Sequence, residues 1–126
     1  MLTIKRQIRI TAGLVTALAE LNSSRTANVI WQALPLSSNV NIWGDEVYFT
    51  IPVKMELEDG QEVVSSGKLG YWPPGNAFCI FFGPTPISRE GEIRAASPVN
   101  IIGKLIDDPK VFKGVKEGER IVVERT

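Results

Sequence analysis

The sequence contains no histidine, and this absence excludes more chemistry than any other feature of its composition. Histidine is the commonest general base near neutral pH and a frequent zinc ligand. Catalytic pairs of serine or cysteine with histidine are therefore excluded. The acidic residues Glu90, Glu92, Asp107 and Asp108 are not spaced like a calcium-binding loop. We expect no metal site and no cofactor, and the pattern identifies no catalytic residue.

Cysteine occurs only once, as Cys79, so the chain cannot form an internal disulfide, which is typical of a reducing cytoplasm. Fourteen basic residues balance fourteen acidic ones, so no net charge attracts nucleic acid or acidic membranes. No apolar run approaches the roughly 18 residues of a membrane span, and the N-terminus lacks a signal-peptide hydrophobic region. These features predict a cytoplasmic protein with one domain over residues 1–126, binding neither nucleic acid nor membrane.

Aromatic residues and prolines are concentrated in one stretch, residues 67–86. Two prolines and a glycine at residues 73–75 separate a strand over 67–72 from a second strand over 77–82. The second strand is apolar on both faces. One face must therefore contact the core, and the other must be covered by a helix, a loop or a ligand. Cys79 lies within this strand, and we interpret it as a small core residue.

The remaining pattern predicts short strands separated by turns. Apolar residues at positions 27, 30, 31 and 34, after the capping residues Ser23 and Ser24, predict one main helix over about 24–34, which Pro35 ends. A short helical turn is expected near 109–114 and a surface loop over 87–98. Strands are expected over 2–11, 14–21, 36–43, 47–57, 61–66, 99–106 and 121–124, with a helix as the alternative for 14–21. Many short strands with one helix indicate a closed, mostly antiparallel barrel.

Three long motifs resemble those of a family. They are Trp-Gly-Asp-Glu-Val-Tyr at 43–48, Gly-Tyr-Trp-Pro-Pro-Gly at 70–75 and Phe-Phe-Gly-Pro-Thr-Pro at 81–86. The chain is identified by them as a member of a group of small prokaryotic cyclophilin-like proteins of unassigned function. Shorter motifs around Thr26, Gly75 and Gly103 are similar to those of the cyclophilins themselves. The resemblance implies a closed eight-stranded cyclophilin-like barrel, and it implies no activity.

Cyclophilins are peptidyl-prolyl isomerases, and the resemblance allows their catalytic residues to be sought in this sequence. They place an arginine after the first helix, where it donates hydrogen bonds to the isomerising peptide. Here no arginine occurs between Arg25 and Arg89, and the place of the cyclophilin histidine falls at about Val99. Arg89 or Arg94 would have to reach across from the predicted loop to replace the missing donor.

The candidate binding site lies between the strand at 43–49 and the strand at 77–85. Its residues are mainly aromatic, and tryptophan and tyrosine carry polar groups that suit a boundary between an apolar floor and solvent. They are Trp43, Glu46, Tyr48, Trp72, Phe78, Phe81, Phe82 and Thr85. The alternative is a fully packed core without a groove.

The site predicts a module that binds a small molecule or a proline-containing peptide and lacks the isomerase arginine. Two other functions stay open at this point. One is an atypical peptidyl-prolyl isomerase that uses the apolar pocket and backbone donors alone. The other is a non-catalytic interaction subunit of a larger enzyme assembly, in which a protein partner contributes the chemistry.

Overall fold

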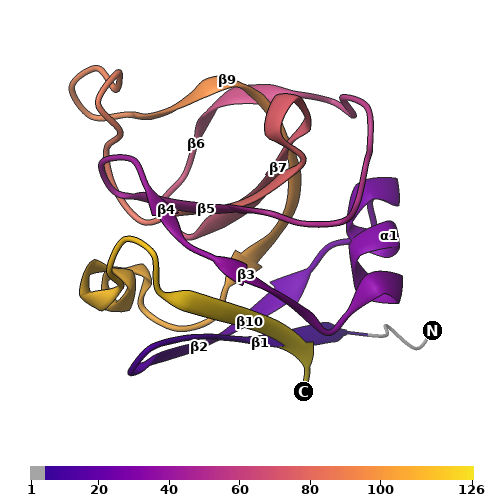
Figure 1. Ribbon diagram of the computed structural model, residues 1–126. Helices are drawn as coiled ribbons and strands as arrows, with labels where there is room; N and C mark the ends of the chain where they lie inside the picture. The colour runs from indigo at the N-terminus through magenta and orange to yellow at the C-terminus, as the bar shows by residue number, and fades with distance from the viewer. Residues whose placement is uncertain (1–4) are drawn as a thin grey trace.

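The computed structural model describes residues 5–126, which form ten β-strands, one α-helix and two short 3₁₀ helices. Strands β1, β2 and β10 lie together at one end, and β5 to β9 lie at the other, with α1 along one side (Figure 1). The strands are β1 (Arg6–Ala12), β2 (Val15–Leu21), β3 (Leu36–Asn39), β4 (Asn41–Ile42), β5 (Glu46–Thr50), β6 (Gln61–Val64), β7 (Lys68–Trp72), β8 (Ala77–Phe81), β9 (Ile93–Leu105) and β10 (Arg120–Arg125). The helix is α1 (Arg25–Ala33), and the 3₁₀ helices are η1 (Pro73–Gly75) and η2 (Pro109–Gly114).

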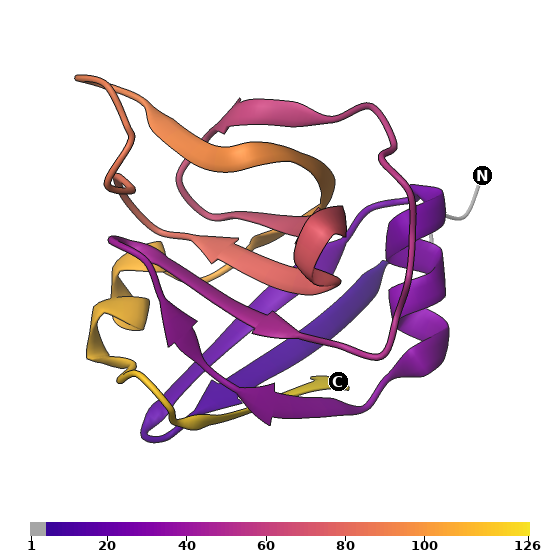
Figure 2. The same ribbon diagram turned by 45° about the horizontal axis from the view of Figure 1, so that its top comes forward.

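All strand pairs are antiparallel, in the order β3-β10-β1-β2-β9-β7-β8-β5-β4, with β6 paired to β9. The sheet curves around a core flanked by α1 (Figure 2). The mostly β architecture with one main helix is therefore confirmed. The predicted closed barrel of eight strands is wrong, because within the described residues no ladder joins the end strands β3 and β4. Only Val40 separates these two strands, which is too short a connection for them to fold back and pair.

Helix α1 begins where predicted, at the cap residue Ser24, whose hydroxyl oxygen accepts from the backbone N–H of Ala27 at 3.1 Å. Its buried face carries Ala27 and Ile30 into the main core. Trp31 lies at the margin of that core, half-buried, with the guanidinium carbon of Arg125 4.3 Å from its ring centre. Trp31 therefore lies on the α1 side of the molecule and supports the fold there.

Two sequence predictions differ from the structure. The strand expected over 47–57 ends at Thr50, because Pro52 cannot donate a ladder hydrogen bond. Beyond Pro52, the Tyr71 hydroxyl replaces a neighbouring strand as hydrogen-bond partner of the backbone. It donates to the Val53 carbonyl at 2.6 Å and accepts from the Met55 N–H at 3.1 Å. The loop expected over 87–98 is shorter, because β9 already begins at Ile93 and pairs with β6.

Other predictions are confirmed. Residues 15–21 form a strand rather than the alternative helix, since β2 pairs along its whole length with β1. The short helical turn forms at Pro109–Gly114. The first part of the strand expected over 2–11, residues 2–4, lies outside the described residues.

A partly buried polar network connects the segment before β6 to α1. The Glu58 carboxylate accepts from the backbone N–H groups of Arg25 and Thr26, each at 3.0 Å. The buried Asn100 amide accepts from the Glu58 N–H at 2.6 Å and donates to the Thr26 hydroxyl and the Glu56 carbonyl. Hydrogen bonds to its oxygens, that of the Thr26 hydroxyl first, lower the pKa of Glu58.

Replacing Asn100 by alanine is expected to lower the free energy of unfolding by about 2 kcal/mol, since it leaves part-buried groups without a partner. Urea unfolding followed by circular dichroism measures the change. Asn100→Asp is the companion variant: it retains the acceptor for the Glu58 N–H and loses the two donated bonds. An unfolding free energy unchanged in both variants would contradict this role of the network.

Candidate functional site

Strand β8 is buried on both faces, as its sequence predicts, but the two faces contact different clusters. Phe78, Ile80 and the following Phe82 belong to the main core under α1, β1 and β2. Ala77, Cys79 and Phe81 belong to a second, smaller cluster with residues of β9 such as Val99. The alternation of side chains along a strand thus divides the apolar stretch between core and a separate floor.

A cavity of about 220 Å³ opens above this smaller cluster. We call it the aromatic cavity. Its lining combines two indoles, a phenol and a carboxyl group with three small apolar side chains. These residues are Trp43, Glu46, Tyr48, Trp72, Ala95, Ala96 and Val99.

Two loops position Trp43 and Glu46 by contacting each other. The Asp45 N–H donates to the Pro84 carbonyl, and the Phe82 N–H donates to the Asp45 carbonyl, both at 2.9 Å. Gly44 has a positive φ of 60°, and a Cβ there would lie 2.8 Å from the Pro86 ring. The motifs at 43–48 and 81–86 are thus adjacent parts of one structural unit beside the cavity.

Trp72 is held in place at the end of β7. Its indole N–H donates to the Ser97 hydroxyl at 2.7 Å. The indole also covers Gly75, where a Cβ would lie 2.8 Å from the ring. The motif at 70–75 therefore contributes one fixed wall of the cavity.

Glu46 is the charged residue of the cavity lining, and its side chain is almost fully buried, with 6% of the residue exposed. It lies opposite Phe81 on β8, and burial raises its pKa to about 7, an effect that a hydrogen bond with the Cys79 thiol partly opposes. Burial, followed by the nearby Glu46 charge, also raises the pKa of the Cys79 thiol, which is therefore unreactive at neutral pH. A carboxyl group that titrates near neutrality inside a cavity is typical of functional sites.

The structure brings together four of the eight predicted site residues. Trp43, Glu46, Tyr48 and Trp72 line the aromatic cavity, and Phe81 lies in the cluster beneath it. Phe78 and Phe82 point to the opposite side of the sheet, into the main core. Alternation along the strand places Phe81 on the face opposite to Phe78 and Phe82, but the sequence does not reveal which of the two faces meets the cavity.

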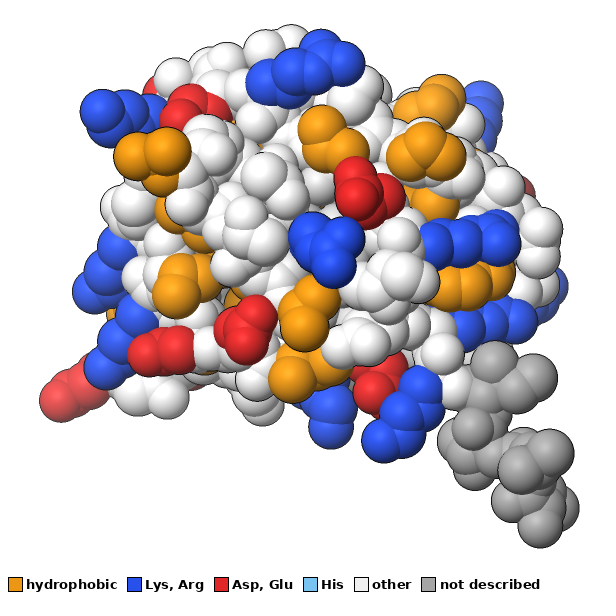
Figure 3. Space-filling model, turned by 90° about the horizontal axis from the view of Figure 1, so that it is seen from below, with side chains coloured by type: hydrophobic (Ala, Val, Ile, Leu, Met, Phe, Trp, Pro, Cys, Tyr) orange, Lys and Arg blue, Asp and Glu red, His pale blue; other side chains and the backbone are white. Residues whose placement is uncertain are grey.

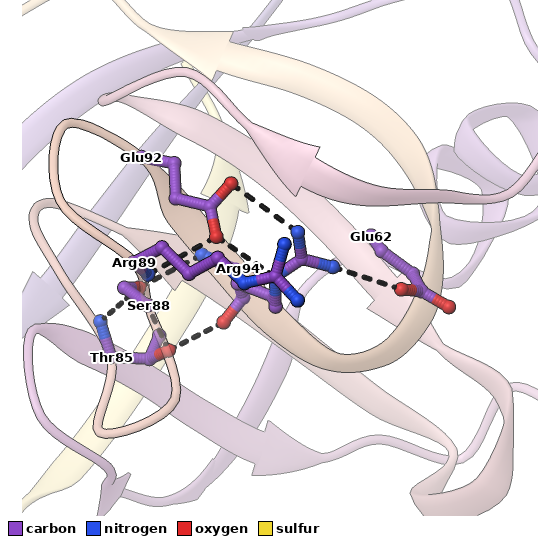
Figure 4. A network of polar contacts seen from close by, with 6 residues as sticks. All are labelled: Glu62, Thr85, Ser88, Arg89, Glu92 and Arg94. Atoms are coloured by element: carbon purple, nitrogen blue, oxygen red, sulfur yellow. Dashed lines mark hydrogen bonds and ion pairs between the residues drawn. The ribbon is translucent and has the colours of Figure 1, made fainter.

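Thr85 does not line the cavity and instead fastens the loop between β8 and β9. Its hydroxyl donates to the Arg94 carbonyl, and its N–H donates to the Ser88 hydroxyl at 2.9 Å (Figure 4). The Arg94 guanidinium donates to Glu92 at 2.9 Å and to Glu62 at 3.2 Å. The hydrogen bond from Arg94 is the main reason that the pKa of Glu92 is lowered.

Sequence reasoning missed the β9 side of the cavity, Ala95, Ala96 and Val99. The signal that could have found it is the pair of alanines, whose small side chains leave space opposite bulky aromatic ones. Among residues 5–126, no group of three or more carboxylate or cysteine side chains is placed to hold a metal ion. In the same range, no helix is long and apolar enough to cross a membrane.

A comparison with known proteins shows the family to which this chain belongs. A sequence profile of the cyclophilin-like family matches residues 6–124. The chain belongs to the cyclophilin-like family. The family resemblance predicted from the three motifs is therefore confirmed. No curated protein matches the chain.

Two solved structures resemble this cyclophilin-like protein. The solution structure of the hypothetical protein AF2241 from Archaeoglobus fulgidus superposes with a TM-score of 0.83 and 42% identity, covering 98% of this chain and 96% of that one. The structure of McbB in complex with tryptophan superposes with a TM-score of 0.72 and 17% identity. The second match covers 94% of this chain but only 44% of McbB, and at this identity the likeness concerns the fold alone.

Proposed function

We propose that this cyclophilin-like protein binds a small, flat and mainly apolar molecule in the aromatic cavity. The observation that carries the proposal is the cavity itself, where Trp43, Tyr48 and Trp72 surround a space above an apolar floor. Concave, mostly apolar sites with a few polar groups are the usual form of small-molecule sites. The distant fold relative McbB was solved with tryptophan, a molecule of this shape, which supports the proposal.

The size of the cavity favours a small molecule over a proline-containing peptide. Its volume of about 220 Å³ lies below the range of roughly 300–1,000 Å³ that is usual for drug-sized ligands. One ring system with a short substituent fits this space, whereas an extended peptide would lie mostly outside it.

The isomerase alternative gains no support from the arginines. Arg94, one of the two arginines that could replace the missing donor, gives its guanidinium hydrogen bonds to Glu62 and Glu92. Within the described chain no arginine or lysine lines the aromatic cavity. The interaction-subunit alternative lacks a large continuous apolar patch on the face shown in Figure 3, where apolar side chains lie in small groups between charged and other polar ones.

Indole, a neutral flat probe, tests the proposal through the three tryptophans. Each contributes one indole N–H resonance, and Trp43→Phe and Trp72→Phe assign two of them. Adding indole is expected to shift the resonances of Trp43 and Trp72 in a saturable way. The Trp31 resonance is the internal control, because Trp31 packs against the main core rather than the cavity. Absence of a saturable shift at Trp43 and Trp72, or a shift confined to Trp31, would contradict the proposal.

A further inference from the structure

Glu46 has no partner of opposite charge in the aromatic cavity. Neighbouring side chains that face it are Tyr48 on β5 and Cys79 and Phe81 on β8, while β9 contributes Ala95, Ala96 and Val99. Of the described residues that line the cavity, none is basic. The nearest arginine in sequence to that β9 segment, Arg94, is already bound by Glu62 and Glu92. The protein itself therefore does not neutralise the Glu46 carboxylate.

A buried carboxylate without a partner is costly, and it is normally paired, hydrogen-bonded or protonated. Glu46 lines the cavity, so a ligand there can contact its side chain directly. The surrounding rings of Trp43, Tyr48 and Trp72 attract cations through their negative faces. An anionic ligand would meet repulsion from Glu46, and a purely apolar one would leave its carboxyl group with the Cys79 thiol as a hydrogen-bond partner but without an opposite charge.

We infer that the ligand of the aromatic cavity is a small organic cation, a protonated amine attached to a flat apolar ring, whose ammonium group pairs with Glu46. This inference rests on the proposed function, because it assigns the chemical class of ligand to the same cavity. The ring contacts the aromatic walls, and the ammonium donates hydrogen bonds to the carboxylate. Binding involves no covalent step.

Isothermal titration calorimetry of the full chain at pH 7 with two matched probes tests the inference. Tryptamine carries an ammonium group, and tryptophol carries a neutral hydroxyl on the same ring and linker. Tryptamine is expected to bind at least about tenfold more tightly, because a charge-assisted hydrogen bond forms only with the ammonium. Glu46→Gln should abolish that preference while tryptophol still binds. Glu56→Gln, which removes an exposed acid that does not line the cavity, should retain it.

Proton release provides a second measurement. Glu46, with a pKa of about 7, is about half protonated in the free protein at pH 7. Pairing with a cation favours the carboxylate, so tryptamine binding should release up to about 0.5 proton per site, measured by titration in buffers of different ionisation enthalpy. Glu46→Gln should release none.

Equal affinities for the two probes, or proton uptake on tryptamine binding, would overturn the inference. In either case the indole shifts at Trp43 and Trp72 would persist, and the proposed function would stand. If neither probe binds and indole shifts no resonance, both the inference and the proposed function fail.

Discussion

Replacing Phe78 by alanine is expected to lower the free energy of unfolding by about 3–5 kcal/mol. Phe78 is completely buried, and its ring stacks on Phe49 with centres 5.1 Å apart and an interplanar angle of 16°. Removing the ring leaves a cavity in the main core, where close packing allows little relaxation. Because whole domains are stable by only about 5–15 kcal/mol, this loss is a large part of the total. Chemical unfolding followed by circular dichroism measures it.

A pair of milder variants separates the core role of Phe78 from a role in binding. Phe78→Leu should remain folded and leave the indole-induced shifts at Trp43 and Trp72 unchanged. Phe81→Leu makes the same chemical change on the cavity side of β8 and should weaken those shifts. If Phe78→Leu abolished ligand binding in a folded protein, or Phe78→Ala cost less than about 1 kcal/mol, Phe78 would not have the core role assigned to it.

Replacing Glu46 by glutamine is expected to stabilise the protein in alkaline solution. Burial raises the pKa of Glu46 in the folded chain to about 7, against an ordinary glutamate value of 4.5. Its contribution to stability is therefore fully present below pH 4.5 and is lost as the pH rises through 7. The difference of about 2.5 pH units corresponds to about 3 kcal/mol at 1.36 kcal/mol per unit. Glutamine keeps the shape and cannot ionise, so it avoids this loss.

The comparison requires unfolding free energies of both proteins between pH 4 and pH 8.5. The two curves should meet near pH 4 and diverge by about 3 kcal/mol above pH 8, with Glu46→Gln the more stable. Glu56→Gln, a change of the same chemistry at an exposed position, should follow the unmodified protein. Parallel curves for Glu46→Gln and the unmodified protein would show that Glu46 does not titrate near neutrality. On the acid side, the lowered pKa of Glu58 should reduce the stability of all three proteins as the pH falls below 4.5.

Local patterns predicted many of the elements. Ser24 and the apolar spacing after it indicated α1, because capping and one-sided apolar periodicity act within a few residues. Pro52 falls within the strand predicted over 47–57, and β5 ends before it at Thr50, while a distant side chain, Tyr71, hydrogen-bonds to the backbone beyond it. Residues 93–98 look like a polar loop in isolation, and they become a strand because β6 pairs with them.

Four of the residues proposed from the sequence as a binding site line one cavity in the structure. Trp43, Glu46, Tyr48 and Trp72 come from the separate motifs at 43–48 and 70–75, and the fold places them around one cavity. Phe78 and Phe82 belong to the same apolar stretch as Phe81, but their side chains face the main core. Which face a strand residue takes depends on register, and register is decided by pairing with distant strands.

The sequence by itself determined that this is a mostly β protein of the cyclophilin-like family without histidine chemistry. Composition, helix caps and turn residues act over a few neighbouring residues, so their effects can be predicted from a single sequence. Only the tertiary structure decided that the sheet ends in β3 and β4, which do not pair with each other, and that β8 divides its side chains between a packed core and a cavity floor. It also decided that Glu46 lies in an apolar cavity without a basic partner among the lining residues, because burial and charge neighbours arise only when strands far apart in sequence come together.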